Sequence, residues 1–152
     1  MEIVLVNPEI PQNTGNIART CALTRTGLHL IKPLGFSLSD RYLKRAGLDY
    51  WDQVQVQVWE SLQEMLAAYP GREIYLATTR AAHSYNEIQY TQDDIIIFGC
   101  ETSGLPREIM EMYPQRRIRI PMLDIGRSLN LSNSAGIILY EALRQLNFPG
   151  LK

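Results

Sequence analysis

Asn16 and Arg19 are a pair of polar residues whose types and spacing suggest binding chemistry. They stand three apart in the stretch Asn16–Thr26, whose apolar residues recur at helical spacing, so both side chains are expected opposite the apolar stripe. A guanidinium group can hold two oxygens of a phosphate, and the amino end of a helix favours negative charge. The pair therefore predicts contact with an anion or nucleotide, although the pattern also fits a plain solvated helix face.

The loop before this predicted helix contains Pro8 and Pro11. Proline disfavours a helical conformation in the residue before it, so we expect extended backbone and a delayed helix start. Asn13 or Thr14 is then the expected amino-terminal cap.

Glu101 stands between two glycines in the segment GCETSGLP, directly after the buried apolar run Ile95–Phe98. Gly99 and Gly104 lack a Cβ atom and could let the backbone approach a ligand closely. We therefore interpret Glu101 as a carboxylate carried at a ligand-binding edge, with a solvated loop glutamate as the alternative.

Two clusters of basic residues could follow an RNA backbone. One lies in a short helix predicted over residues 40–46 and consists of Arg41, Lys44 and Arg45; the other is the group RRIR at 116–119. Clusters of this kind are also common on solvated faces.

Common cofactor and nucleophile signatures are absent from the sequence. There is no GxGxxG after the first apolar run, no GxxxxGK[ST] and no GxSxG, which argues against a Rossmann dinucleotide site, a P-loop and a serine-nucleophile elbow. His29 and His83 have no partners at metal-ligand spacing, so we expect no metal site. We expect His29 to be structural within a strand and His83 to lie in a solvated loop.

Six apolar runs of strand length alternate with helical patterns and must position these residues. The alternation predicts an α/β fold with a mostly parallel six-stranded sheet and helices on both faces. The run at 54–59 contains VQVQVW-type alternation and is expected half-exposed near an edge. Ligands bind such sheets outside the carboxyl ends of the strands, where the polar segments stand. The runs are Ile3–Val6, Leu28–Ile31, Val54–Trp59, Ile74–Thr78, Ile95–Phe98 and Ile118–Ile120.

The last predicted helix, Ser132–Leu146, is apolar on two sides. Ser132 or Asn133 is its expected cap. Ile137 and Tyr140 lie off its main apolar stripe, and a helix that is apolar on both sides is usually buried on both sides. We therefore expect a second subunit to cover this side.

Length and composition fit one soluble domain over residues 1–152. The chain has 45% hydrophobic and 20% charged residues and a net charge of −1, which argues against a surface that is basic overall. No basic leader and no apolar stretch near membrane length occurs, so we expect no membrane association. Cys21 and Cys100 form no CxxC pair and are expected to be reduced thiols of a cytoplasmic protein.

Taken in order, five segments resemble the SPOUT-class RNA 2′-O-methyltransferases, and among them the small single-domain members that methylate the wobble nucleotide of tRNA. The segments are PEIPQNTGNIAR, RAGLDYW, FGCETSGLP, RIRIPM and RSLNLSNSAGIILYEALRQL. The resemblance covers nearly the whole chain. It implies a deep C-terminal trefoil knot, an obligate homodimer, S-adenosylmethionine as methyl donor and tRNA as substrate.

The resemblance also implies roles for individual residues. Arg19, Asn16, Asn130 and Tyr140 match catalytic positions, and Arg19, Ser132, Arg41, Lys44 and Arg45 are the expected RNA contacts. In a knot, the segment GRSLNLSNSAG at 126–136 is expected to be buried and to line the ligand. The expected cofactor-binding residues are Ala77, Thr78, Gly99, Glu101, Gly104, Ile120, Met122, Ser128 and Leu129.

The implied reaction is attack of a ribose 2′-hydroxyl on an activated methyl group. Because the pKa of arginine lies above about 12, we expect Arg19 to hold a phosphate and the hydroxyl rather than to act as a simple base. The sequence departs from the family pattern at Ser103, where arginine is expected, and at Leu143, where tryptophan is expected. Two alternatives stay open: a related enzyme acting on ribosomal RNA, and an inactive RNA-binding dimer.

Overall fold

The computed structural model of the chain describes residues 1–39 and 54–152. The helix predicted over residues 40–46, with Arg41, Lys44 and Arg45, lies outside the described residues.

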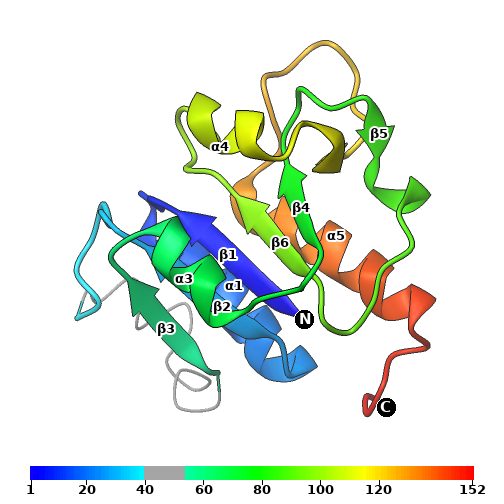
Figure 1. The fold of residues 1–152 in the computed structure, drawn as a ribbon, viewed down its shortest axis with the longest axis horizontal. Helices are drawn as coiled ribbons and strands as arrows, with labels where there is room; N and C mark the ends of the chain where they lie inside the picture. The colour runs from blue at the N-terminus through cyan, green and yellow to red at the C-terminus, as the bar shows by residue number, and fades with distance from the viewer. Residues whose placement is uncertain (40–53) are drawn as a thin grey trace.

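Within the described residues, seven parallel strands form one sheet in the order β3-β2-β1-β6-β4-β7-β5 (Figure 1). The α/β class and the parallel sheet agree with expectation, but the count of six strands was wrong. The additional strand is β5, which pairs with β7 through only two residues. Two residues are too few to show the alternation of apolar and polar side chains that predicts a strand. The strands are β1 (Glu2–Val6), β2 (Gly27–Ile31), β3 (Val56–Trp59), β4 (Ile74–Ala77), β5 (His83–Ser84), β6 (Ile95–Phe98) and β7 (Arg117–Arg119).

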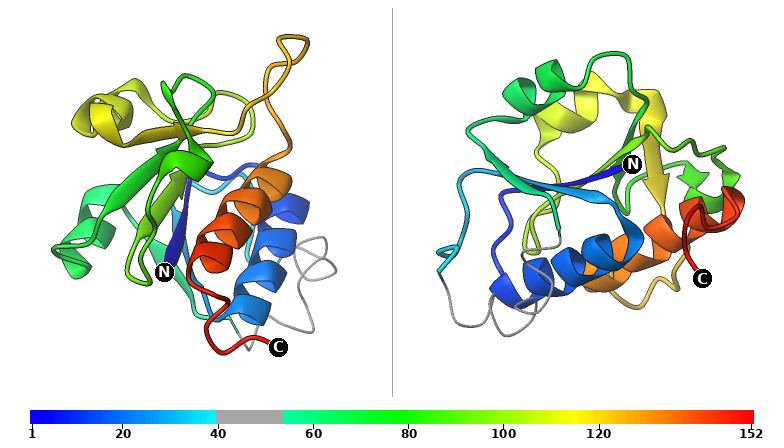
Figure 2. Two further views of the ribbon diagram at one scale, coloured as in Figure 1. Left: turned by 90° about the vertical axis from the view of Figure 1, so that its right-hand side faces the viewer. Right: turned by 90° about the horizontal axis from the view of Figure 1, so that it is seen from below.

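Helices cover both faces of the sheet because successive strand residues point to opposite sides. In β1, Ile3 and Leu5 belong to one core cluster and Val4 and Val6 to the other. Figure 2 shows α1 (Pro11–Thr24) and α5 (Leu131–Gln145) side by side on the first face. The opposite face carries α3 (Leu62–Ala68) and α4 (Arg107–Met112).

The strand β3 occupies one edge of the sheet and is only partly buried, as its alternating sequence predicts. The next strand, β2, is almost fully buried and carries His29. Trp59 Nε1–H donates to His29 Nδ1 over 3.0 Å, so the ring proton is assigned to Nε2, which donates to Glu2 Oε2 over 3.0 Å. His29 is thus a structural residue, as predicted.

The first helix begins earlier than expected. It starts at Pro11, and Ile10 is its cap residue without a side-chain cap bond. The expected delay was wrong because proline is tolerated at the first helical position, where its missing N–H has no helical partner to lose. Asn13 and Thr14 are not caps; they are buried within the first turn.

The last helix is capped by Asn130 rather than by Ser132 or Asn133. The Asn130 side-chain oxygen accepts from the backbone N–H groups of both of those residues. The preceding residues, 121–130, are all exposed in the single chain, so the expected burial of this segment is wrong for its first half. Ala135, five residues into the helix, is the first fully buried one.

Cys21 and Cys100 are both free. Burial raises the pKa of the Cys21 thiol far above its ordinary range. None of the helices in the described residues is long and apolar enough to span a membrane.

Candidate active site

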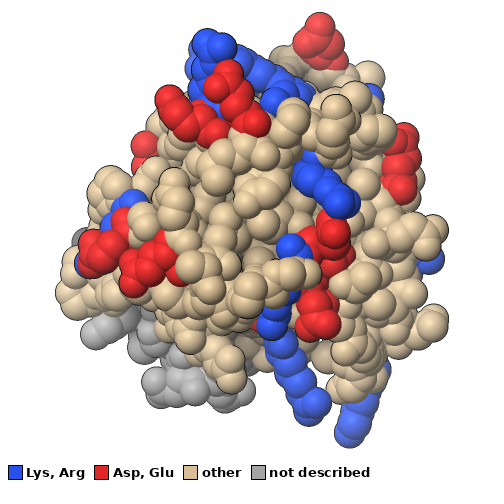
Figure 3. Space-filling model, in the orientation of Figure 1, with Lys and Arg blue, Asp and Glu red and all other residues tan. Residues whose placement is uncertain are grey.

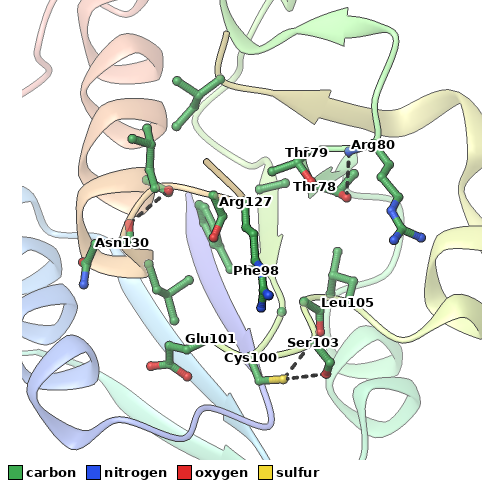
Figure 4. A pocket seen from close by; sticks show the side chains of 18 of the residues that line it. Thr78, Thr79, Arg80, Phe98, Cys100, Glu101, Ser103, Leu105, Arg127 and Asn130 are labelled. Atoms are coloured by element: carbon green, nitrogen blue, oxygen red, sulfur yellow. Dashed lines mark hydrogen bonds between the residues drawn. The ribbon is translucent and has the colours of Figure 1, made fainter. Parts of the chain in front are cut away.

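A cavity of about 550 Å³ opens at the carboxyl ends of three neighbouring strands, β6, β4 and β7 (Figure 4). It is bordered by the segments that follow these strands and by the segment that leads into α5. Its volume lies within the range of small-molecule sites. The sheet edge at which it opens is the one where open parallel sheets bind their ligands.

All the residues expected to bind the cofactor border this one cavity. Asn130 borders it as well. What these residues bind stays a prediction, but the structure brings together three loops that are far apart in the sequence. The residues are Ala77, Thr78, Gly99, Glu101, Gly104, Ile120, Met122, Ser128 and Leu129.

Other predicted residues do not border the cavity in the described chain. Asn16 and Arg19 are exposed on α1, and Tyr140 is exposed on α5. Ser132 also stands back from the cavity, but its hydroxyl donates to Asn130 Oδ1 over 2.7 Å.

The Glu101 carboxylate binds the protein's own first loop. It accepts hydrogen bonds from the backbone N–H groups of Glu9, at 2.8 Å, and Ile10, at 3.2 Å. The Asn13 amide donates to the same carboxylate over 3.0 Å. Three donors therefore occupy a group that the sequence suggested for ligand binding.

A reciprocal contact ties the same two segments together. The Glu9 carboxylate accepts from the backbone N–H of Thr102 over 3.1 Å and from its hydroxyl over 2.9 Å. Glu9 and Glu101 thus each hold the other's loop, and the amino end of α1 is fixed against the loop that follows β6.

Asn13 extends this network to α5. Its side-chain oxygen accepts from Asn130 Nδ2 over 2.9 Å, and Asn130 in turn caps α5. Asn13 is 6% exposed, and its bonds to Glu101 and Asn130 are partly buried. The sequence indicated Asn13 only as a cap, and no spacing pattern could reveal a contact between residues 117 positions apart.

Gly99 and Gly104 are required by the conformation of their own loop. A Cβ atom on Gly99 would lie 2.0 Å from the backbone carbon of Gly104, so the chain can fold back here only over a glycine. Gly104 has a φ of +72°, a conformation that favours glycine. Both observations explain a glycine at these positions without a ligand.

Cys100 lies on the same loop, with Sγ 3.1 Å from the Ser103 hydroxyl. Burial alone would raise the pKa of this thiol, but hydrogen bonds from Ser103 and Thr102 outweigh burial and lower it.

Several cavity residues were not predicted from the sequence, among them Arg80, Arg107 and Arg127. Arg80 and Arg127 stand in segments that follow strands, which is the only signal that could have indicated them. Arg107 gives no such signal.

Comparison with known proteins places this geometry in a family. The SpoU rRNA Methylase family matches residues 1–140. The chain belongs to the SpoU methylase family. A relative from Methylovorus glucosotrophus, named tRNA (cytidine(34)-2′-O)-methyltransferase, is 52% identical over 150 residues, which cover 98% of this chain and 97% of that protein. A Bacillus subtilis protein, named putative tRNA (cytidine(34)-2′-O)-methyltransferase, is 50% identical and covers 100% of this chain and 97% of its own length.

Solved structures of SpoU methylases and related proteins agree with the fold. A putative RNA methyltransferase from Bacillus anthracis superposes with a TM-score of 0.93 at 48% identity, covering 99% of this chain and 97% of that one. A structure described as giving insights into the 2-OH methylation of C/U34 on tRNA superposes with a TM-score of 0.92 at 44% identity, covering 96% and 95% of the two chains.

In this SpoU methylase, Ser103 and Leu143 depart from the expected family pattern, and they lie in different parts of the structure. Ser103 is exposed and contacts Cys100 in the loop that closes over Gly99. Leu143 is buried in the core between the sheet and α5. The first change therefore concerns the cavity rim and the second concerns packing.

Proposed function

We propose that this protein transfers a methyl group from S-adenosylmethionine to the ribose 2′-hydroxyl of the wobble nucleotide, cytidine or a modified uridine, in the tRNA anticodon loop. The observation that carries the proposal is the single cavity bordered by all nine residues that the family resemblance implies for the cofactor. The names of relatives about half identical to this chain over its whole length support the reaction and the position.

The residues at the cavity fit S-adenosylmethionine. Phe98, Leu105 and Ile138 supply apolar surface for a flat ring, and the polar side chains of Thr78 and Ser128 border the same cavity. When bound, S-adenosylmethionine supplies a methyl group that is activated by the positive charge on its sulfur. We propose that Ala77, Thr78, Met122 and Leu129 hold it mainly through backbone and apolar contacts.

The chain's own residues then have to orient the ribose and manage one proton. An arginine guanidinium group is a poor base, so we assign Arg19 the task of holding the hydroxyl and a phosphate in position. Asn16 lies one turn away on the same helix and is assigned to the same substrate face.

Arg19 does not border the cavity of its own chain, and this supports the expected homodimer. Leu23 on α1 and Ile137 and Tyr140 on α5 are 53%, 38% and 49% exposed. We infer that these side chains form one apolar face on the two helices that carry Arg19 and Tyr140. We propose that a second copy covers this face and that the complete active site contains residues of both copies.

We further propose the trefoil knot for the C-terminal part and the cytoplasm as the location. Membership of the SpoU methylase family supports the knot. The free cysteines support a reducing compartment.

Labelled methyl transfer tests this function directly. The purified protein is incubated with methyl-labelled S-adenosylmethionine and total tRNA, and the label is mapped by nucleoside analysis; we expect 2′-O-methylcytidine at the wobble position. Arg19→Ala should lose at least about a hundredfold in turnover while calorimetry shows unchanged S-adenosylmethionine binding. Label in a base instead of a ribose, or full turnover by Arg19→Ala, would contradict the proposal.

The description of the matched family gives one competing substrate, because it refers to rRNA. Parallel reactions with total tRNA and with ribosomal RNA separate the two. Label in ribosomal RNA alone would replace tRNA as the substrate, and no heat on titration with S-adenosylmethionine would favour a non-catalytic RNA-binding dimer.

A further inference from the structure

Three arginines border the cavity, namely Arg80, Arg107 and Arg127. Arg107 Nε donates to Glu111 over 2.7 Å. Neither Arg80 nor Arg127 forms an ion pair with any residue in the two described ranges. Two exposed positive charges are thus left at the rim of the proposed active site.

Glu101 is the acidic residue among those that border the cavity, and within the two described ranges it forms no ion pair with Arg80 or Arg127. Its carboxylate accepts instead from two backbone N–H groups and the Asn13 amide of the first loop. These donors are neutral, so its one negative charge can offset only one of the two positive charges. Elsewhere on the face seen in Figure 3, Lys and Arg are interspersed with Asp and Glu, without one broad basic surface. The uncompensated positive charge at the cavity rim is therefore local.

The covalent structure of RNA indicates what meets this charge. In a ribonucleotide, the carbon next to the one bearing the 2′-hydroxyl carries the 3′-phosphate. Any RNA that brings its 2′-hydroxyl to the cavity must therefore bring that negatively charged phosphate to the rim. A guanidinium group can form two parallel hydrogen bonds to a phosphate.

We propose that Arg80 and Arg127 form a phosphate-binding subsite for the RNA strand on either side of the methylated ribose. The proposal rests on the proposed function and assigns both arginines as positioning residues. It adds two contacts to the RNA-binding residues that the family resemblance implies.

The arrangement of the two side chains favours a strand over a small anion. Figure 4 shows Arg127 extending across the cavity from the segment before α5, whereas Arg80 extends outward from the segment after β4. The two guanidinium groups do not converge on one point, as a single carboxylate of a cofactor would require. Two separated cations at an open rim fit two phosphates of one strand.

Arg80→Gln, Arg127→Gln and the double variant test the subsite in the full-length protein. The probe is an unmodified tRNA transcript with cytidine at the wobble position, and the readouts are KM for tRNA, kcat, the salt dependence of RNA binding, and S-adenosylmethionine binding by calorimetry. Each single substitution should raise KM for tRNA roughly tenfold. It should also reduce the slope of log K against log salt by about 0.7, with unchanged affinity for S-adenosylmethionine.

Two further variants make the test specific. Arg144→Gln removes the same charge from a residue that pairs with Glu141, about 20 Å along α5 from its start, and should change none of these readouts. Arg127→Lys keeps the charge without the planar fork, so it should restore the salt slope and only part of KM. Urea midpoints equal to that of the unsubstituted protein confirm that the variants fold.

The outcomes distinguish failure of the subsite from failure of the proposed function. Weakened S-adenosylmethionine binding with unchanged KM for tRNA would overturn the subsite and assign Arg127 to the cofactor. Unchanged KM and salt slope in the double variant would also overturn it. If the unsubstituted protein methylates no tRNA but its RNA binding depends on both arginines, the proposed reaction fails and the subsite stands.

Discussion

Glu101 shows how one carboxylate can organise a candidate active site through contacts within the protein. It accepts from the backbone of Glu9 and Ile10 and from Asn13, and these contacts hold the amino end of α1 against the loop after β6. A buried donor without a partner costs about 1–3 kcal/mol. The main contribution of Glu101 is therefore expected in loop order and stability.

Replacing Glu101 by Ala should lower the free energy of unfolding by about 1–2 kcal/mol, because the partly buried Glu9 N–H and Asn13 amide lose their acceptor. Urea denaturation measures this loss. Glu111→Ala is the matched control; it removes an exposed carboxylate that pairs with Arg107 and should cost less than about 0.5 kcal/mol. Unchanged stability together with lost S-adenosylmethionine binding would instead make Glu101 a direct ligand contact.

Glu2 is a second carboxylate whose charge stabilises contacts within the fold. Burial alone would raise the pKa of its carboxyl group, but hydrogen bonds from His29 and Arg72, together with the charge of the chain's amino terminus, outweigh burial and lower it. A carboxylate with a lowered folded pKa stabilises the fold above its unfolded pKa of about 4.3, and this contribution disappears as the pH falls through the folded value.

Glu2→Gln should therefore destabilise the protein at pH 7 by about 1–3 kcal/mol, and the difference from the unsubstituted protein should shrink as the pH falls below about 4. Urea unfolding at a series of pH values measures both effects. The side chain of Gln can still accept a hydrogen bond from His29, so the experiment isolates the charge. A difference that persists unchanged at pH 3 would show that shape rather than charge matters at this position.

At the scale of elements, α1 and α5 are joined at their amino ends next to the cavity. Asn130 caps α5 through two backbone N–H groups and also donates to Asn13 in α1. One side chain therefore sets the start of one helix and its distance from the other. The cap and the contact to Asn13 therefore anchor the end of the exposed segment before α5 at the cavity.

Asn130→Ala should cost about 0.5–2 kcal/mol for the lost cap and should also reduce methyl transfer, because the segment with Ser128 and Leu129 loses its anchor. Ser61→Ala removes the cap of α3 on the opposite face, where Ser61 accepts from Glu64, and is the matched control. Thermal unfolding and single-turnover rates are compared for both. If Asn130→Ala and Ser61→Ala lose turnover equally, the loss in Asn130→Ala reflects lower stability of the protein and no specific role at the cavity.

At the scale of the whole molecule, the cavity and Arg19, the proposed catalytic residue, are not adjacent in the single chain. Arg19 lies on α1, outside the residues that border the cavity, and next to it α1 and α5 present the apolar face of Leu23, Ile137 and Tyr140. Apolar residues exposed together on packed helices indicate an interface. The proposed dimer joins both features, since burying this face would place α1 at the contact between copies.

Tyr140→Arg should therefore convert the proposed dimer to a monomer, because a charge in a buried interface is unfavourable without a partner. Sedimentation equilibrium measures the mass, and methyl transfer should fall together with dimerisation. Arg144→Gln on the same helix should stay dimeric and active. A fully active monomer would contradict the assignment of Arg19 to a site shared by two copies.

Local sequence patterns determined much of this protein. Apolar runs alternate with helical periods over short windows, so six of the strands, the parallel sheet and the edge position of β3 could be predicted. The segments that border the cavity could be expected at one sheet edge as well, because strands in such sheets deliver the loops that follow them to that edge. The family resemblance then selected the individual positions within these loops.

Only the tertiary structure decided the features that depend on contacts distant in sequence. The two-residue strand β5 exists because β7 lies beside it, and Asn13 is a link because Asn130 lies opposite. Pro11 begins a helix whose preceding backbone N–H groups are satisfied by Glu101, 91 residues beyond Ile10. Each of these follows from the rule that buried polar groups need partners, and the sequence does not show where in space those partners lie.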